Sequence, residues 1–159
     1  MGLINKAIAY AAKQHDGQYR KKSNIPYIVH PIRVAKLASN FGYNDSLTQT
    51  VALLHDTVED TSSTYEDITN KFGAQVAKGV SYLTDDASRI DYLRKLENSP
   101  DYVKIIKLCD TLDNITTLQC LEEKGIERKI TEWNEFYIPM AEELCPKIAE
   151  QIKKYIRGK

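Results

Sequence analysis

The stretch VALLHDTVEDT, residues 51–61, joins an apolar segment to a group of ionisable side chains. His55 and Asp56 are adjacent, and Glu59 and Asp60 follow about one helical turn later. Because residues three and four apart are neighbours on a helix, these four side chains would share one end of one face if the turn stays helical. Such a group either lies exposed to solvent at a helix end or binds a metal ion that activates a water molecule.

Two other segments carry residues of matching type. His30, in PYIVHPI, stands at the start of a predicted helix, and Asp110, in KLCDTLDNI, lies in an apolar one. A buried carboxylate without a partner is very costly, so Asp110 needs one. Two imidazoles and two carboxylates form a mixed site that suits Mn²⁺, Fe²⁺, Co²⁺ or Zn²⁺. A bound ion lowers the pKa of water, and the acidic pair after His55-Asp56 would orient that water or move its protons.

Each of these residues alone also has an ordinary structural interpretation. An HD dipeptide often occurs by chance, a single histidine such as His30 is more often structural, and Asp110 alone would suit an ion pair or a cap. The combined order H…HD…ED…D…N on helical segments favours a metal site over chance. His15, at the end of the first predicted helix, is predicted to be structural because a cation there is favoured by the helix dipole.

A basic loop precedes His30. YRKKS, residues 19–23, contains one arginine and two lysines between Gly17 and Pro26. A solvated loop is the ordinary interpretation, but these side chains could also reach the phosphates of a ligand held at the ion.

Composition narrows the class of protein. The chain has 159 residues, which predicts one domain spanning residues 1–159. Lys+Arg and Asp+Glu are both 22, so no net basic field indicates a nucleic acid or membrane partner. Three widely spaced cysteines without a CxxC pair predict reduced thiols rather than disulfides or a zinc knuckle. The first residues lack the apolar core of a signal peptide, so we expect a cytoplasmic protein.

Apolar residues recur at helical spacing through most of the chain, which predicts an all-α bundle of roughly seven to nine helices. Several boundaries can be predicted from caps and breakers. They are a second helix from about Pro31, a cap at Asn44 or Asp45, a cap at Thr64 with Asp67, a stop at Gly73, a long helix reaching Leu118, and a kink or division at Pro139 and Pro146.

The ordered residues His30, His55-Asp56 and Asp110 resemble the HD-domain metal-dependent phosphohydrolases. The strings GQYRK, PYIVHPIRVA, VALLHDTVEDT, FGAQVAKGVSYLTD and KLCDTLDNI resemble the hydrolase domain of the RelA/SpoT family, over most of residues 10–118. Because a chain of this length leaves no room for a synthetase, it is similar to the small alarmone hydrolases, including the metazoan SpoT homologue group.

The resemblance implies a compact HD-domain helical bundle, one Mn²⁺, and removal of the 3′-diphosphate of (p)ppGpp to give GDP or GTP and pyrophosphate. It implies four metal ligands, which are His30, His55, Asp56 and Asp110. It implies a catalytic acidic pair, Glu59 and Asp60, and four substrate-binding residues, which are Arg20, Lys21, Asn114 and Thr117. Lys22 is a rival to Lys21, and Tyr137 either contacts the substrate or belongs to the core. Family members often have an aromatic residue or histidine where this chain has Asp113.

Two alternatives stay open. The same site could act on another nucleotide phosphate, such as NADPH, (p)ppApp or a nucleoside monophosphate. A different class would be a non-catalytic HD binding or antitoxin module, which the intact ligand set argues against. In the enzyme reading the partner is a small-molecule nucleotide, with neither nucleic acid nor membrane involved, and the oligomeric state is not indicated.

Overall fold

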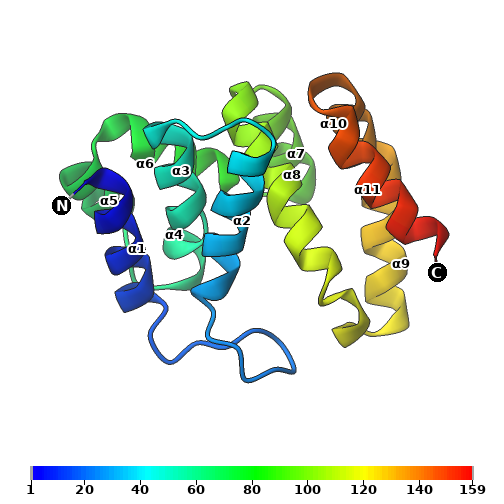
Figure 1. Cartoon of the computed structure of the whole chain (residues 1–159), viewed down its shortest axis with the longest axis horizontal. Helices are drawn as coiled ribbons and strands as arrows, with labels where there is room; N and C mark the ends of the chain where they lie inside the picture. Colours follow the sequence, from blue (N-terminus) through cyan, green and yellow to red (C-terminus); the bar gives the residue numbers. More distant parts are fainter. Residues whose placement is uncertain (1, 159) are drawn as a thin grey trace.

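The computed structural model describes residues 2–158, apart from the side chain of Gln119, and within this range it is helical without any strand (Figure 1). The α-helices are α1 (Leu3–Gln14), α2 (Val29–Asn40), α3 (Ser46–Leu54), α4 (Thr57–Asp60), α5 (Tyr65–Phe72), α6 (Ala74–Leu83), α7 (Arg89–Glu97), α8 (Asp101–Ile115), α9 (Glu123–Glu132), α10 (Ile138–Leu144) and α11 (Pro146–Arg157). A 3₁₀ turn, η1, covers Leu118–Cys120, and a π-helical segment, η2, covers Trp133–Tyr137.

The all-α prediction is confirmed. Two residues separate α3 from α4, and α9, η2 and α10 follow one another without a break. If each of these two runs is taken as one helix, residues 2–158 contain nine helices, the upper end of the expected range.

Caps predicted from the sequence set several of the helix ends. The Asp45 carboxylate accepts a hydrogen bond from the Thr48 backbone N–H at 2.9 Å and so begins α3. Thr64 and Asp67 form a reciprocal capping box at the start of α5. Local chemistry therefore fixes where the helices around the candidate site begin.

Two predicted boundaries are wrong by a few residues. The second helix begins at Val29 rather than near Pro31, which places His30 within its first turn. The long helix α8 ends at Ile115 and not at Leu118. The hydroxyls of Thr116 and Thr117 donate to the carbonyls of Asp113 and Asn114, so side chains satisfy acceptors that a longer helix would have used.

Helices α2, α3 and α8 form the centre of the molecule. Helix α2 packs on both α3 and α8, while α1 and α6 cover α3. On the other side of α8 lie α10 and α11, so the C-terminal helices are separated from α1, α5 and α6 by the central helices (Figure 1). The polar segments identified in the sequence thus belong to three helices that meet directly.

No helix within residues 2–158 is both long and apolar enough to cross a membrane. The three cysteines are free, as their spacing predicts.

Close packing of α6 against α3 depends on Gly79. A Cβ atom added there would lie 2.7 Å from Val51 Cγ2, and Val51 is completely buried. In a close-packed core such a side chain has little room to move. Gly79 therefore has a packing role although glycine is a poor helix former.

We expect Gly79→Ala to destabilise the protein by about 1–3 kcal/mol, because overpacking at Val51 should outweigh the gain in helix propensity. The melting temperature should fall by several degrees, since about 1 kcal/mol corresponds to roughly 2–4 °C at this chain length. Gly125→Ala is the matched control, because a Cβ there meets its nearest atom, Leu121 Cβ, at an ordinary 3.6 Å. Equal or higher melting temperatures for both variants would contradict the packing role.

Candidate metal centre and active site

Three of the predicted metal ligands come together. The ligand atoms of His30, His55 and Asp56 all lie within 4.8 Å of one another. The Asp56 Oδ2 atom is 3.4 Å from His30 Nε2 and 3.1 Å from His55 Nε2. Both histidines are buried, so this cluster is closed to solvent on most sides.

The fourth predicted ligand, Asp110, borders the cluster. Its Oδ1 atom lies 3.1 Å from His30 Nε2 and 4.0 Å from His55 Nε2. Its carboxylate also accepts hydrogen bonds from Lys107 at 2.8 Å and from Asn114 at 2.5 Å. Asp110 is therefore placed to join the ion's ligands, while two neighbours on α8 hold it in position.

Both imidazole rings are oriented by hydrogen bonds from Nδ1. His55 Nδ1 donates to the Ala52 carbonyl at 2.7 Å, and His30 Nδ1 donates to Asp113 Oδ2 at 2.7 Å. Each Nε2 therefore faces the cluster. Among the described residues, buried His55 Nε2 has no hydrogen-bond partner. An outer-shell acceptor on one ring nitrogen and an unsatisfied second nitrogen are the usual arrangement of a histidine that binds a metal.

The turn between α3 and α4 brings His55 and Asp56 to the same ion position. The helix is interrupted at these two residues and resumes at Thr57, rather than continuing as the sequence spacing assumed. Thr57 stabilises the break, because its hydroxyl donates to the Leu54 carbonyl at 2.7 Å. The side chains of adjacent residues, about 100° apart on a regular helix, can converge because of this break.

Buried charge perturbs the cluster strongly. Burial lowers the pKa of His30, but hydrogen bonds to Asp110, Asp113 and Asp56 outweigh it and raise this pKa to about 11. Burial raises the pKa of Asp56, but the neighbouring His55 and His30 hold it well below its usual range. In the metal-free chain these groups thus share protons that a divalent cation would displace.

The acidic pair lies at the rim of the same cavity. Glu59 and Asp60 are exposed on α4 and line, with the cluster, a cavity of about 240 Å³. Glu59 Oε2 accepts a hydrogen bond from the Asp85 backbone N–H at 2.8 Å. Burial raises the pKa of Glu59, the Asp85 N–H lowers it, and the nearby Asp56 charge raises it, with a net upward shift. Glu59 is thus a carboxylate positioned to exchange protons beside the cluster.

Tyr27 links the cluster to the acidic pair. Its hydroxyl contacts Asp56 Oδ2 at 2.7 Å and Asp60 Oδ2 at 3.0 Å. Burial, followed by the charge of Asp56, raises the pKa of this phenol, so it stays protonated and able to donate. Sequence reasoning missed Tyr27, although its position three residues before His30 was a usable signal.

The four predicted substrate-binding residues surround a second cavity of about 530 Å³ that adjoins the first. Arg20 donates to Asn114 Oδ1 at 2.8 Å and to Thr117 Oγ1 at 3.3 Å, and its guanidinium lies over the Tyr27 ring. Lys21 also lines this cavity. Lys22, which has a φ of 52°, is not among the lining residues, so the geometry favours Lys21 over its rival. Tyr27, Asp60 and Asn114 line both cavities.

Three cations that the motifs did not identify as site residues also face the cluster. Arg89, Lys107 and Lys129 line the same cavity as His30. Burial, followed by the nearby Lys107 charge, lowers the pKa of Lys129, while Asp110 and Glu132 partly oppose this shift. Arg89 and Lys129 lie outside any recognisable motif, and only the packing of α7 and α9 near α8 places them.

Tyr137 and His15, the two other residues considered in the sequence, both lie in the interior beside the site. Tyr137 is almost completely buried, and its hydroxyl accepts a hydrogen bond from Arg89 at 3.2 Å, so it supports the edge of the site from the core. His15 is buried, contacts Gln18 Oε1 at 2.8 Å and packs on the Tyr27 ring.

The sequence matches a known protein family. Residues 7–102 match the family described as HD domain. The chain therefore belongs to the HD domain family.

Two of the similar proteins have the same name. The chain is 39% identical over 140 residues to guanosine-3′,5′-bis(diphosphate) 3′-pyrophosphohydrolase of Xenopus tropicalis, covering 82% of this chain and 78% of that protein. It is 38% identical over 153 residues to the enzyme of the same name from Aquifex aeolicus, covering 89% of this chain but 21% of that protein. The chain thus spans about a fifth of the length of the Aquifex relative.

The fold is also similar to that of a solved structure. A metazoan ortholog of SpoT, described as hydrolysing ppGpp and acting in starvation responses, superposes with a TM-score of 0.85 at 28% identity, covering 99% of this chain and 96% of that one. The resemblance to the hydrolase domain of the RelA/SpoT family is confirmed by these relatives.

Asp56→Ala should abolish tight metal binding, because it removes the carboxylate that contacts both histidines. Loss of an outer-shell partner typically lowers metal affinity about 10–100-fold, so loss of a ligand should exceed this. Calorimetric titration with Mn²⁺ measures the change, circular dichroism checks the helical fold, and Asp16→Ala serves as an exposed control. Unchanged affinity in Asp56→Ala would remove Asp56 from the ligand set.

Metal binding should release protons. Because the pKa of His30 is raised to about 11 in the metal-free chain, its ring is protonated at neutral pH and must lose a proton to become a ligand. Apparent metal affinity should therefore rise with pH, by up to about tenfold per pH unit for each proton released. Titration calorimetry in buffers of different ionisation enthalpy counts these protons. Binding without proton release would contradict the assignment of His30.

Proposed function

We propose that this chain is a metal-dependent hydrolase of the 3′-diphosphate of (p)ppGpp, with His30, His55, Asp56 and Asp110 as ligands of one Mn²⁺. The observation that carries the proposal is that Asp60, beside Glu59 at the cluster, also lines the cavity that contains Arg20. A cluster alone would suit many HD-domain hydrolases. The adjoining nucleotide-sized cavity and the relatives named for (p)ppGpp hydrolysis support this substrate in particular.

In the reaction the oxygen of water bonds to the phosphorus that carries the ribose 3′ oxygen. The bond between this phosphorus and the 3′ oxygen breaks, and the 3′ oxygen takes up a proton to become the free hydroxyl of the nucleotide. The products are GDP or GTP and pyrophosphate. A divalent ion bound at the cluster supplies positive charge that polarises a phosphate oxygen and lowers the pKa of water. Glu59, whose pKa is raised, accepts the proton of the attacking water at its free carboxylate oxygen.

Tyr27 and Asp60 hold the groups around the reacting phosphate in position. The Tyr27 hydroxyl holds Asp56 and Asp60 at a fixed separation, so the ligand and the second acid move together. This connection orients Asp60 towards the shared part of the two cavities. Pre-organised groups of this kind lower the barrier without further reorganisation.

The nucleotide occupies the cavity beside the basic loop. Residues 19–26 are closed into a rigid loop, because Arg20 N–H donates to the Ile25 carbonyl at 2.9 Å and Tyr19 pairs with Pro26. The loop holds Arg20 over Tyr27, and its contacts with Asn114 and Thr117 fix the guanidinium. Arg20 and Lys21 then bind base or phosphate oxygens, and Asn114 and Thr117 orient Arg20 and the sugar.

The 3′-diphosphate that water attacks lies in the cavity beside the cluster. Arg89, Lys107 and Lys129 supply positive charge there. Lys107 is already paired with Asp110, whereas no ion pair of Lys129 is found among residues 2–158, so Lys129 can pair with a phosphate oxygen. These cations stabilise the negative charge that develops as the bond breaks.

Incubation with ppGpp and Mn²⁺ should release pyrophosphate, measured by an enzyme-coupled assay or by phosphorus NMR. A panel containing NADPH, (p)ppApp and a nucleoside monophosphate, each with several divalent ions, tests the alternative substrates. Faster hydrolysis of another nucleotide would show that the substrate assignment is wrong and that the assigned reaction type is right. No turnover with any of them would leave the proposal without support and favour a binding module.

Glu59→Gln should keep the metal but slow hydrolysis about 100-fold or more, since it removes a proton acceptor and not a ligand. The pKa of Glu59 is raised above its ordinary value of 4.5, so its carboxylate is protonated at a higher pH than usual. We therefore expect kcat to fall on the acidic side of the pH profile, beginning above the pH at which an ordinary glutamate would cause this loss. At saturating metal, Glu59→Gln should not show this fall in kcat.

Glu66→Gln on α5 is the control, because it makes the same change at an exposed acidic residue away from both cavities. An equal loss of Mn²⁺ affinity in Glu59→Gln would reassign Glu59 to the ligand set.

The proposal includes the organisation of the protein. We treat the chain as a single HD hydrolase domain, supported by the packing of α10 and α11 on α8. We also propose a cytoplasmic protein that needs neither nucleic acid nor membrane as a partner.

A further inference from the structure

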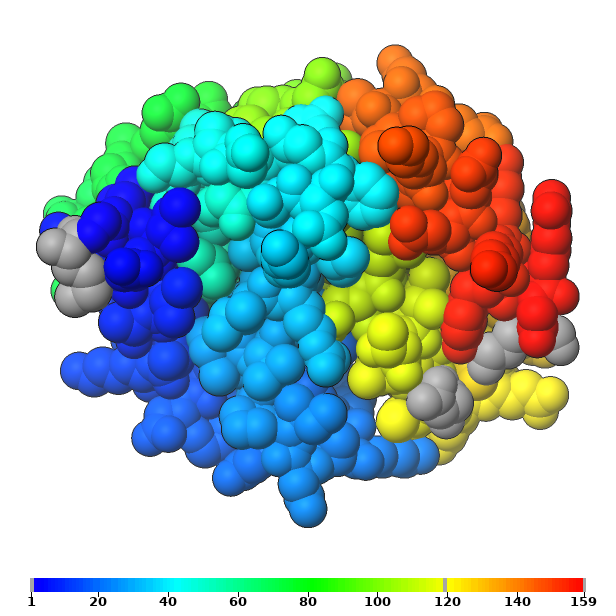
Figure 2. All heavy atoms as spheres, viewed as in Figure 1, coloured from blue at the N-terminus to red at the C-terminus, as the bar shows by residue number. Residues whose placement is uncertain are grey.

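A third cavity lies apart from the active site, on the face formed by α2, α8 and α11. Its volume is about 700 Å³, larger than either cavity near the metal cluster. Figure 2 shows this region as a depression in which α8 is exposed between α2 and α11. Small-molecule sites typically have volumes of about 300–1,000 Å³, so the cavity is large enough for one organic ligand.

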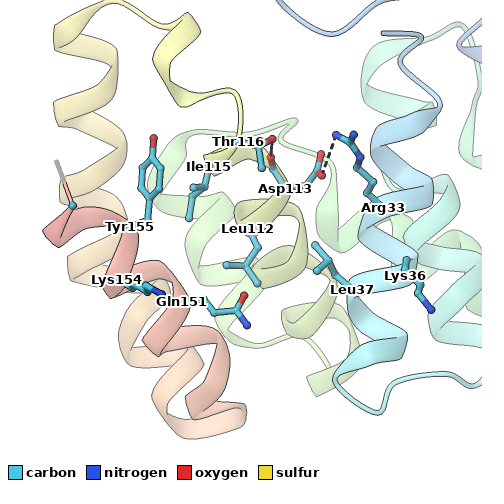
Figure 3. Close-up of a pocket in the computed structure, with 11 residues that line it drawn as sticks. Arg33, Lys36, Leu37, Leu112, Asp113, Ile115, Thr116, Gln151, Lys154 and Tyr155 are labelled. Atoms are coloured by element: carbon cyan, nitrogen blue, oxygen red, sulfur yellow. Dashed lines mark hydrogen bonds and ion pairs between the residues drawn. The ribbon is translucent and has the colours of Figure 1, made fainter.

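The bottom of this cavity is aliphatic. Leu37 from α2 and Leu112 and Ile115 from α8 point into it, as Figure 3 shows. Leu37 and Leu112 are only partly buried, so they leave apolar surface open to water. Covering such surface is favourable by roughly 25 cal/mol per Å² of apolar area. The bottom of the cavity therefore suits a hydrocarbon body.

The rim of the cavity is cationic. Arg33 and Lys36 on α2 lie opposite Lys154 on α11 (Figure 3). Among residues 2–158, neither Lys36 nor Lys154 has an ion-pair partner, and both side chains are exposed. Within residues 2–158, no carboxylate therefore forms an ion pair with either of these two lysines.

The one lining carboxylate does not cancel this charge. Asp113 is 5% exposed and accepts the hydrogen bond from His30 Nδ1 at 2.7 Å, so it is committed to the metal cluster. Its other oxygen lies 3.9 Å from Arg33 Nη1, at the outer limit of an ion pair, while the Arg33 side chain is 49% exposed. The Arg33 guanidinium therefore remains available to a stronger anionic partner.

We propose that this cavity is a second ligand site, for a small amphipathic anion that has an aliphatic body and a carboxylate head. The body covers Leu37, Leu112 and Ile115, the head lies at the Arg33 side of the rim, and Lys36 and Lys154 add positive charge around the cavity. Charge complementarity decides the occupant, because a neutral apolar partner would leave the cations of the rim unpaired. Binding here needs neither the metal nor a nucleotide, so its test is independent of the proposed function.

Decanoate is the probe, and decyltrimethylammonium, with the same chain length and the opposite charge, is the matched control ligand. Titration calorimetry of the metal-free protein below the micelle concentrations should show saturable 1:1 binding of decanoate and at least tenfold weaker binding of the ammonium. Amide NMR shifts should locate decanoate at Leu37 and Leu112. No saturable binding, or equal binding of both ligands, would overturn the proposal.

Two variants test the residues. The double variant Lys36→Glu/Lys154→Glu should weaken decanoate binding at least tenfold, while the double variant Lys13→Glu/Lys78→Glu, with the same charge change at exposed lysines elsewhere, should bind as the wild type does. Leu112→Trp should fill the cavity and abolish binding, with a cooperative melt to show that it folds. Wild-type affinity in both cavity variants would reject the site.

Sedimentation tests the other occupant, a second copy of this chain. A wild-type dimer that Lys36→Glu/Lys154→Glu converts to monomer would overturn the proposal, because the cavity would then be an interface. A wild type that sediments in one state, unchanged by these substitutions, supports a small ligand.

Discussion

The structure depends on the burial of two imidazoles and two carboxylates at the meeting point of α2, α3 and α8. Buried charges destabilise a fold unless they are paired. Here each member is held by a neighbour, with His30 on Asp113, His55 on the Ala52 carbonyl, Asp56 on Tyr27, and Asp110 on Lys107. The contact between His30 and Asp113 joins α2 to α8, and the contacts of the two rings point the His30 and His55 Nε2 atoms at one position. The same constraint that satisfies the buried groups therefore shapes a cation site.

The polar cluster also explains local irregularities around it. The helix is interrupted at His55 and Asp56, where His55 Nε2 and Asp56 Oδ2 lie 3.1 Å apart. The resumed helix α4 then presents Glu59 and Asp60 at the open rim, where water can enter. Two of the four candidate ligands and the acidic pair thus lie within six residues of chain.

Charge is distributed unequally around the cavities. The cluster and acidic pair are negative, and cations surround them from the basic loop, α7, α8 and α9. A divalent ion at the cluster would balance its carboxylates, and the surrounding cations would then pair with the phosphates of the proposed substrate. Asp113 connects the cluster to the cavity between α2 and α11. It orients His30 inside and limits the charge of the cationic rim between α2 and α11 outside.

The sequence by itself determined the helical class, the caps at Asp45 and Thr64, and the candidate ligand and acidic residues, because periodicity, capping and motif spacing are local properties. Only the tertiary structure decided which atoms meet. Arg20 reaches Asn114 across 94 residues of sequence, and His30 reaches Asp113 across 83. Tyr27, Arg89 and Lys129 enter the site, and Leu37 and Lys154 share a cavity, through the packing of helices that no local pattern encodes. Contacts of that kind depend on how whole helix faces fit together, and this is why spacing alone could name the chemistry but not complete the site.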